Sequence, residues 1–178
     1  ELTSWVYDPV SDTIRSTINS ASYLGFISPQ SYMDYEAEVV ISSVNHDDDR
    51  IGFVVAFHVD SAGREHTLSA MRVASVTYQG NPYLFALVYN QSQSDERILA
   101  VGEGLVEPGA GWAGKFTKLR VVRSGSTVTV QAADFGTSAG NIPPYSSTIT
   151  FDLESDQALS DMFGGEQRIG FSVFSQQD

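Results

Sequence analysis

Short segments rich in Val, Ile, Phe, Tyr and Thr recur about every ten residues along this 178-residue chain, separated by clusters of Gly, Asn, Pro, Ser and Asp. This alternation of short strands and turns is typical of an all-β sandwich or barrel. One helix is expected, over residues 153–163, with Ser155 as its cap and Gly164 and Gly165 ending it. The predicted strands are 22–27, 34–42, 51–59, 65–73, 83–90, 97–101, 115–123, 126–132, 147–151 and 168–175.

Alternation of side chains assigns faces to two of these strands. Residues 34–41 alternate acidic and apolar side chains, which predicts one solvated face and one buried face. Residues 51–59 are apolar on both faces, so we expect a central strand. Two short links, 61–64 and 123–126, read as hairpins, with Gly63 at positive φ. The predicted faces are Asp34, Glu36 and Glu38 outward in the first strand, and Ile51, Phe53, Val55, Phe57 and Val59 together, opposite Val54 and Ala56, in the second.

Composition excludes several classes of function. A formal net charge of −12 and a pI near 4.4 argue against nucleic acid as a partner. Cysteine is absent, so disulfides and thiolate metal sites are ruled out. No apolar run reaches the roughly 20 residues of a membrane helix, so we expect no membrane insertion. The chain opens on ELTSWVYDP rather than on a signal-like segment, and we expect residues 1–178 to be a single domain excised from a larger protein.

Two segments carry a family resemblance. DDDRIGFVVAF (residues 47–57) resembles the acidic strand entry of the thrombospondin C-terminal domain and related concanavalin A-like jelly rolls, and RIGFSVFSQ (168–176) resembles their closing strand. The wider pattern is similar to lectin-like modules of bacteriophage tail-fibre or whisker proteins and of bacterial adhesins. The resemblance implies an antiparallel two-sheet jelly-roll sandwich located outside the cell, on a virion or a bacterial surface.

The acidic run itself suggests a calcium site. Asp47, Asp48 and Asp49 repel one another, and a divalent cation would offset their charge. In the thrombospondin relatives the corresponding run helps to bind calcium, and the resemblance carries that role to these three residues. Asn45, with Asp60 or Asp152 from another loop, could complete the oxygen shell. The alternative is a solvated turn in which one Asp caps backbone amides.

Aromatic and amide side chains near the predicted loops are candidates for sugar binding, because sugars stack on aromatic rings and hydrogen-bond to amides. Trp112, in the glycine-rich connection 102–114, is the leading stacking candidate. Packing in the core is the alternative for each aromatic residue. The other candidates are Tyr78, Tyr83, Tyr145, Asn90 and Asn141.

Catalysis finds little support in the sequence. The alternating E-x-D-x-x-E motif of sandwich glucanases is missing, and no nucleophile elbow is present. A lyase would need a Tyr or His base beside a cation, which His58, His66, Arg64 and Arg72 could supply, although surface polar pairs are the alternative. We therefore predict a non-catalytic, calcium-dependent module that binds a cell-surface glycan. A structural or oligomerisation module of the same parent assembly is the first alternative, and a polysaccharide hydrolase or lyase is the second.

Overall fold

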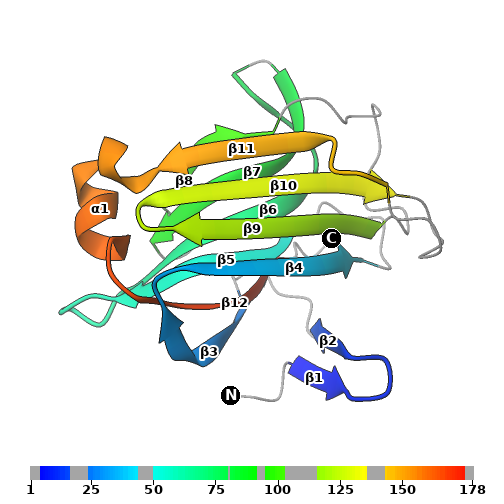
Figure 1. Ribbon diagram of the computed structural model, residues 1–178, viewed down its shortest axis with the longest axis horizontal. Helices are drawn as coiled ribbons and strands as arrows, with labels where there is room; N and C mark the ends of the chain where they lie inside the picture. Colours follow the sequence, from blue (N-terminus) through cyan, green and yellow to red (C-terminus); the bar gives the residue numbers. More distant parts are fainter. Residues whose placement is uncertain are drawn as a thin grey trace.

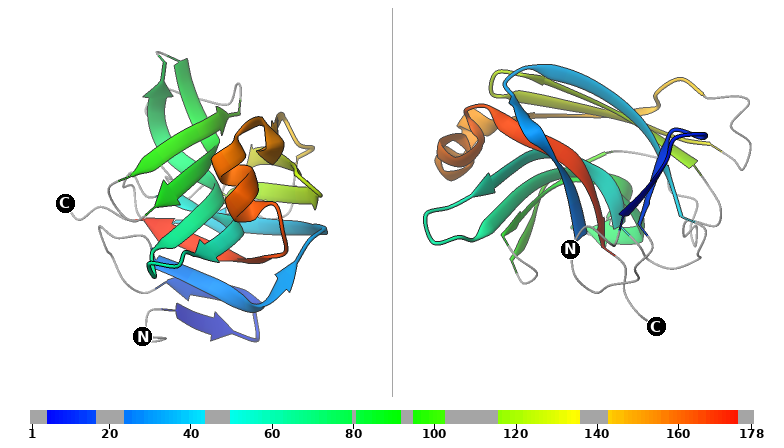
Figure 2. Two further views of the ribbon diagram at one scale, coloured as in Figure 1. Left: turned by 90° about the vertical axis from the view of Figure 1, so that its left-hand side faces the viewer. Right: turned by 90° about the horizontal axis from the view of Figure 1, so that it is seen from below.

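The computed structural model describes residues 5–16, 24–43, 50–79, 81–91, 95–102, 116–135 and 143–174. These residues form two antiparallel sheets stacked face to face, with a short helix at one end (Figures 1 and 2). The all-β sandwich expected from the sequence is therefore confirmed. Among the described residues, no helix is long and apolar enough to cross a membrane.

The larger sheet has six strands and the smaller one has four, and every pair of neighbours is antiparallel. The larger sheet has the order β3 (Leu24–Tyr32), β12 (Gln167–Phe174), β5 (Arg50–Val59), β6 (Glu65–Tyr78), β7 (Asn81–Gln91) and β8 (Glu96–Val101). The smaller sheet has the order β11 (Ser147–Asp152), β10 (Thr127–Phe135), β9 (Phe116–Ser124) and β4 (Tyr35–Ser42).

The core fills the space between the two sheets. Leu119, Val121 and Val130 of the smaller sheet pack in one cluster with Leu68 and Leu87 of the larger sheet, and all five are fully buried. In β4 the odd-numbered residues face this core and the even-numbered ones face solvent, as the alternation predicts. Removing this apolar area from water is the main term that stabilises such a sandwich.

Strand β5 is central, as predicted, but its faces differ from the prediction. The register against β6 shifts between Val54 and Ala56, and this bulge brings Ala56 into the core together with Phe53 and Val55. An extra residue at a bulge reverses the side to which all later side chains point. The expected grouping of Phe57 and Val59 with Ile51, Phe53 and Val55, opposite Ala56, is therefore wrong beyond Val55.

Two further strands and the ends of several others differ from the prediction. A separate hairpin, β1 (Trp5–Asp8) with β2 (Thr13–Ser16), lies near the chain start, where no strand was expected. Its turn contains Asp12 at positive φ, a conformation that Asp tolerates. β6 continues to Tyr78, and β3 runs past Pro29 to Tyr32. Gly63 has the positive φ that its hairpin requires.

The predicted helical segment 153–163 is divided in two. A 3-10 turn, η2 (Leu153–Ser155), comes first, followed by helix α1 (Gln157–Phe163), which does end before the two glycines. Asp156, not Ser155, is the N-cap: its carboxylate accepts from the amides of Ala158 and Leu159. The expected Ser155 cap is thus wrong, because that hydroxyl donates instead to the Asp152 carbonyl oxygen at 2.6 Å.

Helix α1 closes one end of the sandwich (Figure 2). Its buried side chains, Leu159 and Phe163, join the core cluster, and the Phe163 ring meets the Tyr89 ring edge-on at 6.2 Å. Arg123 on β9, itself 1% exposed, donates to the carbonyl oxygens of Phe163 and Gly165 and so ties the end of the helix to the smaller sheet. Burial lowers the pKa of this guanidinium.

Candidate functional site

An open groove of about 420 Å³ lies between α1 and the β5–β6 hairpin. Its volume is within the range of small-ligand sites. The β5–β6 link supplies one wall, α1 supplies the other, and β7 lies between them. The lining residues are His58, Asp60, Arg64, His66, Tyr89, Gln91, Ala158, Asp161 and Met162.

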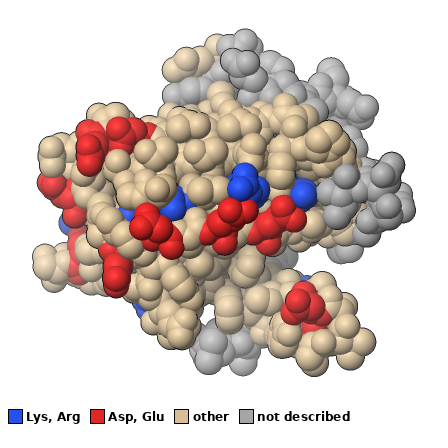
Figure 3. Space-filling view, in the orientation of Figure 1, with Lys and Arg blue, Asp and Glu red and all other residues tan. Residues whose placement is uncertain are grey.

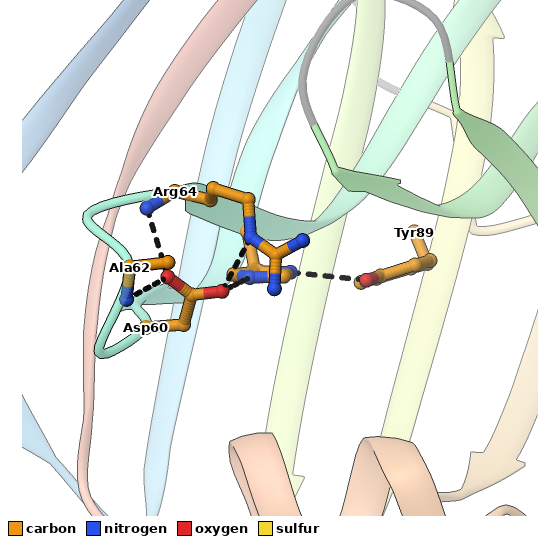
Figure 4. A network of polar contacts seen from close by, with 5 residues as sticks. Asp60, Ala62, Arg64 and Tyr89 are labelled. Atoms are coloured by element: carbon orange, nitrogen blue, oxygen red, sulfur yellow. Dashed lines mark hydrogen bonds and ion pairs between the residues drawn. The ribbon is translucent and has the colours of Figure 1, made fainter.

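Asp60 organises the hairpin wall (Figure 4). One carboxylate oxygen accepts from the amides of Ala62 (2.8 Å) and Arg64 (2.9 Å). The other accepts from Arg64 Nε at 2.7 Å and contacts His66 Nε2 at 3.2 Å. The Arg64 amide bond, with further help from the Arg64 side chain, His66 and Ala62, holds the pKa of Asp60 well below its usual range. Asp60 is therefore a fixed anion that shapes the turn.

His66 connects this turn to β7. The ring is 3% exposed, and its Nδ1 lies 3.0 Å from the Tyr89 hydroxyl. Because the Asp60 carboxylate can only accept, Nε2 carries the proton toward it, and in the neutral ring Nδ1 accepts from the Tyr89 O–H. Burial, and then the negative charge of Asp95, raises the pKa of Tyr89. At neutral pH Tyr89 is thus a protonated donor.

The Tyr89 ring is held on several sides. It stacks on His66 at 6.2 Å, and the Arg97 guanidinium lies 5.5 Å from its centroid. Arg97 also donates to Asp156, the cap of α1, at 2.8 Å. Tyr89 therefore forms a rigid floor of the groove. Met162 and Ala158 on α1 supply an apolar surface beside it.

The remaining lining side chains are available to a ligand. Arg64 has 62% of its side chain exposed, and its two terminal nitrogens extend beyond the Nε bond to Asp60. Gln91 offers an amide, His58 an imidazole and Asp161 a carboxylate. Such a set of planar donors and acceptors beside a small apolar patch suits a polyhydroxylated ligand.

Most of the residues predicted for metal or sugar binding lie outside the described part of the chain. These are Asn45, Asp47, Asp48, Asp49, Trp112 and Asn141. Tyr78 and Tyr83 are described only as backbone positions, on β6 and β7. Within the described ranges, no three His, Asp or Glu side chains gather as a metal site.

The described strand ends locate the points at which those segments join the sandwich. Residues 44–49 join β5 at Arg50, and 103–115 join β9 at Phe116. Arg50 pairs with Phe174, and Phe116 pairs with Ser42 and Phe135. Both junctions therefore lie at the end of the sandwich opposite α1. Asp60 and Asp152 lie at the α1 end. There Asp152 is the N-cap of η2, and its carboxylate accepts from the Glu154 amide. The calcium shell itself stays a prediction, because residues 44–49 lie outside the described part of the chain.

Asn90 and Tyr145 lie on different sheets. Asn90, on β7, is 5% exposed, and neither polar atom of its amide has a hydrogen-bond partner among the described residues. Tyr145 precedes β11 and donates to Glu38 of β4, while Lys118 of β9 lies 4.4 Å from its ring centroid. The Glu36–Arg120 pair extends the same charged row on the outer face of the smaller sheet (Figure 3). Of the predicted outward acids, Glu36 and Glu38 thus pair with cations of β9, whereas Asp34, just before β4, accepts from the Gly125 amide.

The structure also shows what the sequence reasoning missed. It brings together His58, His66 and Arg64, but Arg72 is fully buried elsewhere and contacts Asp134 at 3.4 Å. The sequence did not predict that Tyr89 lines the groove and contacts His66. An Asp opening a short hairpin link, as in Asp60-Ser-Ala-Gly-Arg64, is the available signal for the Asp60 turn.

Comparisons with known proteins do not assign this chain to a family. No protein-family model matches the sequence, and no curated protein matches it. Twenty-three chains of solved structures do match. One is the CBM2 module of the Lactobacillus casei BL23 phage J-1 evolved Dit, at 11% identity and a TM-score of 0.34; the match covers 97% of this chain and 60% of that one. This chain thus spans about 60% of that structure's length.

Fold and site together define the class of this protein. It is an antiparallel β-sandwich whose helix-capped end carries a polar groove.

Proposed function

We propose that this domain is a non-catalytic, lectin-like module that binds a cell-surface glycan in the groove beside α1. The groove carries this proposal, because it combines hydrogen-bonding side chains with a hairpin wall that Asp60 already fixes through four contacts. A wall ordered before binding costs little further conformational entropy when a sugar binds. The sequence resemblance supports a parent protein of the tail-fibre or adhesin kind, and hence an extracellular location.

A groove variant tests this proposal. Gln91→Ala removes an amide from the lining, and Gln91 is only partly buried, so we expect glycan affinity to fall while the melting temperature stays nearly unchanged. Gln30→Ala is the matched control, since Gln30 is exposed on β3 and does not line the groove. A glycan array in which both variants bind like the unaltered protein would refute the groove. An array without any binding would favour the structural or oligomerisation role, exercised through the parent protein.

Calcium dependence is a further part of the proposal, and the sequence alone supports it. Three carboxylates and the Asn45 amide within five residues form the hard oxygen donor set that Ca²⁺ prefers. The ion would neutralise the run next to Arg50, at the start of β5. It would therefore stabilise the end of the sandwich opposite the groove. The same end receives the segment that contains Trp112, which remains our candidate for a second sugar contact.

One observation favours a catalytic role as the second candidate. Asp60, His66 and Tyr89 form a chain in which an acid orients a base that contacts a hydroxyl, the arrangement found beside activated nucleophiles. The raised pKa of Tyr89 opposes its use as a base at neutral pH. Incubation with a panel of polysaccharides tests this role. Product formation that Tyr89→Phe abolishes would establish an enzyme.

A further inference from the structure

The charge of the groove points to the kind of sugar that it accepts. We infer that the groove takes neutral and amino sugars and excludes uronic, sialic and phosphorylated ones. The inference rests on the glycan-binding role proposed above and adds the chemical class of the ligand. It follows from how the charges on the two walls are paired.

Arg64, which lines the groove, and Arg97, which lies behind it against the Tyr89 ring, are both already matched by carboxylates. Arg64 Nε lies 2.7 Å from Asp60, and Arg97 Nη2 lies 2.8 Å from Asp156. The guanidinium nitrogens can still donate to sugar hydroxyls, but their positive charge is offset. A sugar carboxylate would therefore lose its hydration without meeting an uncompensated cation.

Asp161 gives the groove a negative charge of its own. This exposed residue of α1 lines the groove, and among the described residues its carboxylate accepts only from the neutral Gln157 amide, at 2.6 Å. Segment 153–163 contains three acids and neither Lys nor Arg. Acidic side chains accordingly gather at the end of the molecule that bears α1 (Figure 3). A ligand ammonium would find a partner at Asp161.

The charge of the whole chain acts in the same direction. At −12, its field repels anionic glycans before contact and attracts cationic ones. Salt screens this effect over about 8–10 Å, so it weakens at high ionic strength. Local pairing and overall charge thus predict the same order of preference.

Four β-linked tetrasaccharides of similar length test this order by calorimetry at about pH 6, where amino groups carry a proton. They are the β-1,4-linked tetramers of glucosamine, N-acetylglucosamine and glucose, and the β-1,4-linked tetramer of glucuronate for the anion. We expect glucosamine to bind on the order of 5-fold more tightly than glucose, as a single exposed ion pair allows. We expect the glucuronate tetramer not to bind. The neutral N-acetylated tetramer separates the effect of charge from that of nitrogen.

Asp161→Asn should remove the preference for glucosamine over glucose, because the Asn side chain carries no charge while its oxygen can still accept from Gln157. Asp12→Asn, on the remote β1–β2 turn, makes the same change of charge and should preserve the preference. Suppose that the unaltered protein binds all four tetramers with equal affinity and that Gln91→Ala lowers these affinities equally. The glycan site in the groove would then be supported, and the proposed selection by charge would be wrong. If none of the four binds, both proposals fail.

Discussion

Phe163 is the residue by which α1 is anchored, and its truncation tests whether this helix is an integral part of the sandwich. Its side chain is fully buried in the core cluster and packs edge-on against Tyr89. Deleting a buried aromatic ring costs its transfer free energy plus the cavity that remains, together about 3–5 kcal/mol. Phe163→Ala should therefore lower the free energy of unfolding by about that amount. In a chain of this size it should lower the melting temperature by about 6–20 °C.

Urea unfolding followed by circular dichroism measures the loss. Phe163→Leu keeps most of the volume and should cost less than about 1.5 kcal/mol. Phe26→Ala is the matched control: the same ring is deleted, but Phe26 is 38% exposed, so the loss should stay well below that of Phe163→Ala. Equal losses for the two alanine variants would refute the claim that α1 is anchored in the core. Glycan affinity should fall with Phe163→Ala and survive Phe163→Leu, because α1 forms one wall of the groove.

Three further predictions concern calcium, pH and a buried hydroxyl. EDTA should lower the melting temperature, because a metal that binds only the folded state stabilises it, and Asp48→Asn should abolish the response; an unchanged melt argues against the site. The pKa of Asp60 is lower in the folded than in the unfolded state. The contribution of this carboxylate to the free energy of unfolding is therefore fully present above the unfolded pKa of about 3.9, and it is lost as the pH falls from there through the folded pKa. Asp60→Asn should therefore flatten the acid limb of stability measured against pH, and an identical limb contradicts this. Tyr35→Phe removes the bond from the Tyr35 hydroxyl to the Val55 carbonyl oxygen and should cost about 1 kcal/mol in urea unfolding, whereas a neutral result would show that water satisfies that carbonyl.

The sequence carries the fold through periodicity, which reports burial one strand at a time. The faces of β4 follow directly from alternation, because that strand pairs regularly with β9 along its whole length. β5 could not be assigned in the same way. Its bulge depends on the register with β6, and nothing in GFVVAF indicates where the extra residue falls.

The groove depends on contacts between residues far apart in the chain, so little of it could be read from local pattern. Asp60 and Arg64 belong to one turn and follow turn chemistry. Tyr89 joins them only because β6 and β7 pair, and α1 joins them only because the core fixes Phe163. The sequence predicted that His58, His66, Arg64 and Arg72 could converge; the first three line the groove and Arg72 does not.

Mapping a bound glycan by amide chemical shifts tests the central claim most directly. A sugar selected from the array is titrated into the isotope-labelled domain, and the shifts are assigned along the chain. We expect the shifts to concentrate on residues 58–66, 89–91 and 157–163, the walls and floor of the groove. Shifts that leave these three segments unchanged and fall instead on the Trp112 indole or on the outer face of the smaller sheet would contradict it.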